Sequence, residues 1–162
     1  WSRFGSFLFA PSALIAYVRG KSRPEHRVGH TPLGALSVFA LLLVLMAQVA
    51  TGLMSDDEIA FFGPLVRFVS GDTVAAATSY HKNIGKFIVI ALVVLHVAAI
   101  LFYKWVKKDG LVRPMVLGDK QLGAGLVVPQ TRDSLASRLL ALVVLTVCAG
   151  AVAWLVRLGH AF

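Results

Sequence analysis

The chain has 162 residues, of which 57% are apolar, and its mean hydropathy is +0.77. Ordinary soluble domains are about half apolar and carry more charge, so this composition indicates an integral membrane protein. The single cysteine, Cys148, excludes an intrachain disulfide, a zinc site of paired cysteines and the C-x-x-C-H attachment of c-type haem. Because the sequence begins with Trp1 rather than Met, we expect a fragment or a processed form of a longer polypeptide.

A short amphipathic stretch lies within residues 1–31. The sequence "PSALIAYV" begins at Pro11, carries apolar side chains on one side, and is followed by basic residues and Pro24. This pattern is typical of a helix that lies in the membrane interface, with its cations at the level of the lipid headgroups. We therefore expect a short interfacial helix before the first span.

Three later segments are long and apolar enough to cross a bilayer, which needs about 20 consecutive apolar residues in a helix. They comprise residues 32–54, 82–103 and 137–159. Thr31 precedes the first of them as a candidate N-terminal cap, and Pro32 suits the first turn. The sequence thus predicts an all-α integral membrane helical bundle, with residues 1–162 forming a single membrane domain of three transmembrane helices.

The connecting segments differ in charge. Residues 1–31 and 104–136 are basic, whereas residues 55–80 hold one arginine against Asp56, Asp57, Glu58 and Asp72. Cytoplasmic loops carry an excess of Lys and Arg, so the basic segments are expected in the cytoplasm, with the loop 55–80 and the C-terminus in the periplasm. The net charge of +8 then follows from topology and from contact with anionic lipid. No basic soluble domain is present to bind nucleic acid, so nucleic acid is not expected as a partner.

Two histidines mark the second span: His81 begins it, and His96 lies inside its apolar run. Their separation of 15 residues corresponds to about 22 Å along a helix, with a net rotation of about 60°. Both side chains therefore face roughly the same sector but cannot bind one metal ion together. This spacing suits two cofactors that lie at different depths in the bilayer.

Three explanations of His96 remain open. Haem ligation would satisfy a ring nitrogen that hydrocarbon cannot, but a hydrogen bond across helices or a proton relay would also do so. A porphyrin needs room, and Gly85 lies one turn after His81 on the same face, while Gly34 and Gly52 allow close approach to the first span. Small residues in membrane helices also serve plain helix packing. His26 and His30, in the basic N-terminal segment, are expected at headgroup level.

Four runs of the sequence together resemble one family. These are "RVGHTPLGALSVFALLLV", "ATGLMSDDEIAFFGPL", "HKNIGKFIVIALVVLHVAAIL" and "GLVRPMVLGDK". Their order and spacing resemble the bacterial cytochrome b561 family, which includes the b-type cytochrome subunits of membrane-bound nickel–iron hydrogenases. The resemblance extends from about residue 1 to residue 120, and the last span resembles an extra helix of some members.

In that family a four-helix bundle holds two b-type haems through four histidines, two of which lie on the fourth helix. The resemblance implies His81 as a ligand of the outer haem and His96 as a ligand of the inner haem, with Gly85 beside the outer one. The three spans would correspond to the third, fourth and extra fifth helices. The other ligands would come from missing N-terminal helices or from another chain. His30 would approach the propionates of the inner haem.

The function implied is that of a dihaem cytochrome of the bacterial inner membrane and its respiratory chain. It would carry electrons between the quinone pool and a periplasmic redox partner, either a c-type cytochrome or a hydrogenase-like protein. It would be an electron carrier or a quinone-linked oxidoreductase subunit rather than a stand-alone enzyme. The alternatives are a non-haem membrane anchor or assembly subunit, and a proton-conducting protein that uses His96. The spans contain no Asp or Glu, which disfavours proton conduction.

Overall fold

The computed structural model describes residue 5 and residues 8–21, 30–108, 110–117 and 134–160. Apart from one isolated bridge between Asp56 and Phe62, the regular structure of these residues is helical. Several residues used in the charge and histidine arguments above lie outside the described residues: Arg3, Arg23, Glu25, His26, Arg27, Lys120 and Arg132.

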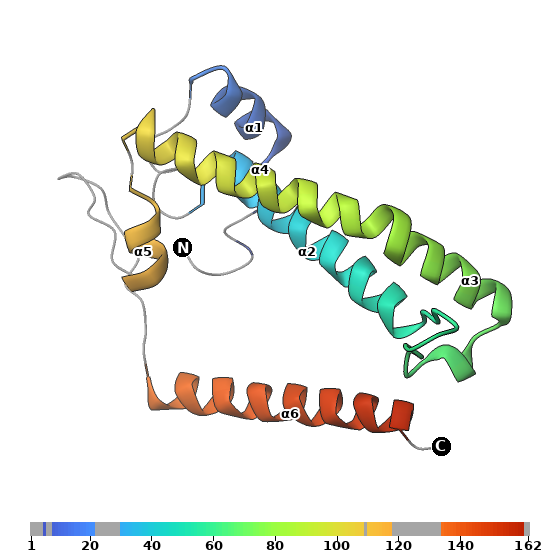
Figure 1. The fold of residues 1–162 in the computed structure, drawn as a ribbon. Coiled ribbons are helices and arrows are strands. Elements are labelled where there is room, and N and C mark those ends of the chain that lie inside the picture. Colours follow the sequence, from blue (N-terminus) through green and yellow to red (C-terminus); the bar gives the residue numbers. More distant parts are fainter. Residues whose placement is uncertain (1–4, 6–7, 22–29, 109, 118–133, 161–162) are drawn as a thin grey trace. The chain divides into compact units, whose positions relative to one another are not determined.

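Three helices are long and apolar enough to span a membrane, which confirms the predicted fold class. The first is α2 (Pro32–Leu53), and the last is α6 (Leu135–His160). The second is a continuous helix over Gly71–Trp105, built from α3 (Gly71–Tyr80), the π-helical turn η4 (His81–Gly85) and α4 (Lys86–Trp105) (Figure 1).

The second spanning helix begins at Gly71, not at residue 82 where its apolar run begins. Its first turn is capped by Ser70, whose hydroxyl oxygen accepts a hydrogen bond from the backbone N–H of Thr73 at 3.3 Å. Asp72 adds a negative charge at the positive end of the helix dipole. Capping and dipole effects stabilise the start of a helix without requiring apolar side chains. The apolar pattern alone therefore underestimates the length of this helix.

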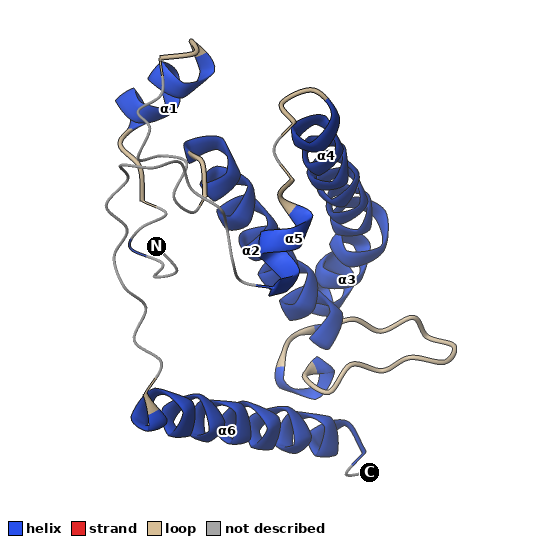
Figure 2. Cartoon of the chain, turned by 90° about the vertical axis from the view of Figure 1, so that its left-hand side faces the viewer, coloured by secondary structure: helices blue, strands red, loops and turns tan. Residues whose placement is uncertain are grey.

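The chain divides into two compact units, and each takes part of α2 and of the second spanning helix. The first unit comprises Trp1–Val44 and Val89–Pro129, and the second comprises Leu45–Ile88 and Gln130–Phe162. In the described residues, both units consist of helices joined by loops (Figure 2).

In the first unit, α1 (Pro11–Val18) is a short helix with no buried residue, as expected of an interfacial segment. The Tyr17 hydroxyl is hydrogen-bonded to the Tyr103 hydroxyl near the end of α4. Thr31 caps α2, because its hydroxyl oxygen accepts a hydrogen bond from the backbone N–H of Gly34 at 3.2 Å, which confirms the predicted cap. A further short helix, α5 (Val112–Leu117), follows α4.

In the second unit, the loop after α2 folds back on itself. The backbone N–H of Asp56 donates to the Thr78 hydroxyl oxygen at 3.0 Å, which fixes the loop to α3. The Asp57 carboxylate accepts hydrogen bonds from the backbone N–H groups of Phe61, Ala60 and Ile59 at 2.7, 2.9 and 3.2 Å. These three bonds, with a smaller contribution from Lys82, lower the pKa of Asp57 to about 2.

The same loop contacts the C-terminal end of α6. The Arg67 guanidinium donates to the Leu158 carbonyl oxygen at 2.6 Å, and Gly159 lies so close to Pro64 that an added Cβ would be 3.3 Å from the Pro64 Cβ. The helix end therefore meets the acidic loop within this unit.

Few residues of the spanning helices are fully buried inside the chain. Such residues make up only 6% of the most apolar window in α2 and in the helix Gly71–Trp105, and none of it in α6. Among the described residues, the buried side chains are small, such as Ala35 and Ser55. The helices are therefore stabilised mainly by transfer into lipid, and the few polar contacts between them determine how they associate.

The Asp57 contacts predict a pH-dependent loop. The folded-state pKa lies below the ordinary value of 3.8, so the stabilisation is fully present above about pH 4 and is lost as the pH falls towards 2. Hydrogen exchange of the amides of residues 59–61, corrected for its intrinsic pH dependence, should show constant protection above pH 4 and a loss below it. Asp57→Ala should remove the protection at every pH, and Asp72→Asn should not. Unchanged protection in Asp57→Ala would contradict this account.

Candidate functional site

His81 occupies the π-helical turn η4, where α3 meets α4. The backbone N–H of Lys86 donates to the His81 carbonyl oxygen, five residues back along the chain. π-helical turns are rare and occur mostly as single-turn distortions, frequently at functional sites. The position of this turn therefore distinguishes His81 from the other histidines that the structure describes.

The His81 ring has a defined hydrogen-bonding partner. Its Nδ1 lies 2.9 Å from the backbone carbonyl oxygen of Gln48 on α2. A carbonyl oxygen can only accept, so in the neutral ring Nδ1 must carry the proton. Nε2 is then the unprotonated nitrogen, with a lone pair available to a metal, and this is the usual arrangement of a metal-ligating histidine.

Gln48 returns a second hydrogen bond to the same residue. Its side-chain Nε2 donates to the His81 backbone carbonyl oxygen at 3.1 Å. Its Oε1 is buried and has no hydrogen-bond partner within the described part of the chain. Sequence reasoning missed Gln48, although an amide inside the apolar run of α2 was the available signal, because such a group needs an internal partner.

Two glycines make this contact possible. A Cβ added at Gly52 would lie 2.8 Å from Cε1 and 3.1 Å from Nδ1 of the His81 ring. A Cβ at Gly85 would collide with Gln48 Oε1 and would lie 2.9 Å from Tyr80 Cε1. The glycine against the histidine ring is therefore Gly52, while Gly85 lies against the side chain of Gln48.

A cavity of about 400 Å³ lies beside this cluster in the second unit. His81 and Gln48 line it together with the ammonium-bearing side chains of Lys82 and Lys86 and the residues Ser55, Asp57 and Phe61. An imidazole, the apolar ring of Phe61 and two ammonium groups in one lining match the chemistry of haem b, which combines iron, an apolar macrocycle and two anionic propionates. The residues present thus fit this group.

His96 lies on α4 in the first unit and is half-buried. The structure gives its ring no hydrogen-bond partner among the described residues. His30 is close enough to interact with it electrostatically. The pKa of His30 lies below its ordinary value, first because neighbouring atoms partly exclude water from it, and second because of His96. His30 and His96 thus lie in the same unit and interact electrostatically, while His81 is in the other unit.

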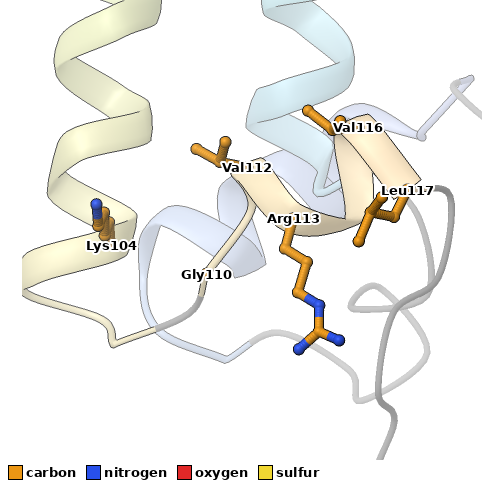
Figure 3. A pocket seen from close by; sticks show the side chains of 6 residues that line it. All are labelled: Lys104, Gly110, Val112, Arg113, Val116 and Leu117. Atoms are coloured by element: carbon orange, nitrogen blue, oxygen red, sulfur yellow. The ribbon is translucent and has the colours of Figure 1, made fainter.

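A second cavity, of about 460 Å³, lies in the first unit around α5. It is lined by Lys104, Gly110 and four residues of α5, among which Arg113 extends its guanidinium away from the helix (Figure 3). The described residues of its lining include no histidine, cysteine or carboxylate and so offer no ordinary metal ligand. Across the described residues, moreover, no three His, Cys, Asp or Glu side chains form a group that could hold a metal ion.

The family model of the prokaryotic cytochrome b561 matches residues 2–118. The chain belongs to the prokaryotic cytochrome b561 family. No curated protein and no solved structure matches it. The match confirms the resemblance found in the sequence, and α6 lies beyond it. The chain is accordingly a bacterial b-type membrane cytochrome that takes part in electron transfer. Members of this family bind haem b.

The close approach at Gly52 predicts that even a methyl group there is destabilising. Gly52→Ala would force the His81 ring or α2 to move, at a cost of about 1–3 kcal/mol. Gly150→Ala is the matched control, because a Cβ at Gly150 would have nothing within 4 Å and should be neutral or slightly stabilising. Unfolding of the two variants of this cytochrome b561 by titration with sodium dodecyl sulfate measures the difference. Equal stability of the two variants would show that the ring does not pack on Gly52.

Proposed function

We propose that this cytochrome b561 binds two haems b and transfers electrons across the membrane between a quinone and a periplasmic redox protein. His81 is an axial ligand of the outer haem and His96 an axial ligand of the inner one. The observation that carries the proposal is the hydrogen bond from His81 Nδ1 to the Gln48 carbonyl oxygen, which leaves Nε2 available to iron.

The division of the chain supports two separate sites. His81 belongs to the second unit and His96 to the first. Each haem then needs a second axial ligand, which the proposal assigns to another helix of the protein or to a partner chain. Bound haem b would supply a one-electron iron couple, whose potential the axial ligands and their surroundings adjust.

Hydrogen-bond donors are available for the propionates of both haems. Lys82 and Lys86 line the cavity beside His81, where two ammonium groups would neutralise the propionates of the outer haem. On the inner side, His30 is close to His96 and is the candidate to donate a hydrogen bond to the inner haem's propionates. These residues bind and orient, and they are not themselves oxidised or reduced.

The acidic loop is the candidate docking surface for the periplasmic partner, either a c-type cytochrome or a hydrogenase-like protein. Asp56, Asp57 and Glu58 give it negative charge, and Ile59 at its tip is 93% exposed. Complementary charge speeds the encounter of a basic partner. The chain would thus serve as an electron carrier or a quinone-linked oxidoreductase subunit, not as a stand-alone enzyme.

A non-haem anchor or assembly subunit is the second candidate. The absence of burial in the most apolar window of α6 favours it, because such a surface suits a partner helix as well as lipid. A visible difference spectrum, dithionite-reduced minus oxidised, separates the candidates. Sharp b-type bands from the protein expressed from its complete gene support the cytochrome, and their absence supports the anchor.

Ligation predicts separable losses of haem. His81→Ala should remove mainly the outer haem and His96→Ala mainly the inner one, because each imidazole holds a different iron. Pyridine haemochrome assay counts haem per chain, and redox titration shows which component is gone. Transmembrane electron transfer should fail in both variants. Retention of two haems by either variant would exclude that histidine as a ligand.

The orientation predicts the sidedness of cysteine labelling in intact cells. A Cys148→Ala background is needed, because Cys148 is exposed. A membrane-impermeant maleimide should then label Ile59→Cys in the periplasmic loop, and should label Lys107→Cys only after the inner membrane is permeabilised. The proposal puts the C-terminus on the periplasmic side as well, and the hydrogen bond from Arg67 to the Leu158 carbonyl near the end of α6 supports it. Labelling of Lys107→Cys in intact cells would overturn this orientation.

A further inference from the structure

We infer that Gln48 is a positioning residue for the outer haem ligand: its side-chain amide enters the hydrogen-bond ladder of the second spanning helix, holds the π turn η4 open and thereby sets the orientation of His81. The effect of Gln48 on haem binding rests on the proposed function, whereas its effect on the geometry of the helix does not.

The first step is the hydrogen bonding of the His81 carbonyl. In an α-helix this oxygen would accept from the residue four positions on, which is Gly85. Here it accepts from the backbone N–H of Lys86, five positions on, and from Gln48 Nε2 at 3.1 Å. A carbonyl oxygen has two lone pairs and can accept both bonds. Insertion of a side chain into the ladder is a recognised cause of local helix distortion.

The second step is the space that the inserted amide occupies. Gln48 Oε1 lies where a Cβ of residue 85 would be, so only glycine at this position lets the amide reach the ladder. Gly85 is buried, as expected of a residue covered by another side chain. The π turn, Gly85 and Gln48 thus form one arrangement.

The same arrangement also orients the imidazole ring of His81. Gln48 holds His81 at two points, because its backbone oxygen binds Nδ1 at 2.9 Å while its amide binds the His81 carbonyl. One bond orients the imidazole and the other fixes the backbone from which it projects. Partners of this kind orient metal-ligating histidines, and their removal weakens metal binding by about 10–100-fold.

The amide nitrogen is the part of the Gln48 side chain that holds the π turn open. Its Oε1 is buried without a partner among the described residues, which is unfavourable for a polar atom. A leucine would fill similar volume without that penalty. What leucine cannot provide is the N–H donor at the His81 carbonyl.

Gln48→Leu tests the inference in the protein expressed from its complete gene. We expect the backbone bond to Nδ1 to remain possible while the π turn relaxes towards an α-helix. Retention of the outer haem should weaken about 10-fold or more, and the redox titration should show a shifted potential for that component alone. Ser37→Ala, a polar-to-apolar change on the same helix in the first unit, should leave both haems unchanged.

A double-mutant cycle with Gly85→Ala identifies the contact. Gly85→Ala alone should weaken the outer haem site, because its Cβ displaces the Gln48 amide. In a Gln48→Ala background it should cost less, since the nearest atom it collides with is gone and only the contact with Tyr80 Cε1 remains. Fully additive losses would mean that Tyr80 alone accounts for the effect of Gly85→Ala, and would overturn the arrangement.

A readout independent of haem keeps the inference testable if a variant binds none. Hydrogen exchange should show altered protection of the Gly85 amide in Gln48→Leu, because relaxation to an α-helix would move its hydrogen bond from the carbonyl five residues back to that of His81. No change in that amide, together with unchanged haem retention and potentials, would refute the role of Gln48.

The His81→Ala variant separates this inference from the proposed function. If His81→Ala keeps both haems, ligation by His81 fails whatever Gln48 does. If His81→Ala loses the outer haem while Gln48→Leu alters neither haem retention nor the Gly85 amide, ligation stands and only the positioning role fails.

Discussion

The paired hydrogen bonds between Gln48 and His81 are the interaction on which the second unit depends. In lipid, an apolar helix face gains little by leaving hydrocarbon for another apolar face, so van der Waals packing and polar contacts decide how helices associate. Here the Gln48 amide donates to the His81 carbonyl oxygen and the His81 imidazole donates to the Gln48 carbonyl oxygen, across two helices that have few fully buried residues. These bonds therefore fix the register of α2 against the second spanning helix at the level of His81.

The two glycines act at the same level because a short polar contact needs close backbones. Gly52 on α2 has no side chain where the imidazole lies, and Gly85 on the facing turn has none where the Gln48 amide lies. A larger residue at either position would separate the helices before the hydrogen bonds could form. Small residues in membrane helices are common packing devices, but here each one faces a particular polar group.

Features that depend on nearby residues could be predicted from the sequence. Three uninterrupted apolar runs gave three spanning helices, and Thr31 before Pro32 gave the cap of α2. The start of the second spanning helix at Gly71 was missed because Ser70 and Asp72 stabilise it by capping and charge, while hydropathy falls there. The π turn and its partner were missed for a different reason. They arise from a contact between Gln48 and His81, 33 residues apart, and no periodic pattern encodes it.

The two histidines of one helix are consequently held by different means. His81 donates its Nδ1 proton to a carbonyl oxygen, which makes the ring a more basic ligand and favours the oxidised iron of a bound haem. Lys82 and Lys86 beside it act in the opposite direction, because positive charge favours the reduced state. His96 has no such carbonyl among the described residues and has the titratable His30 as its neighbour. If each histidine binds a haem as proposed, a hydrogen bond and fixed cations would adjust one site and a second histidine the other, so two chemically identical ligands would give haems of different potential. A difference of that kind would give electron transfer between them a direction.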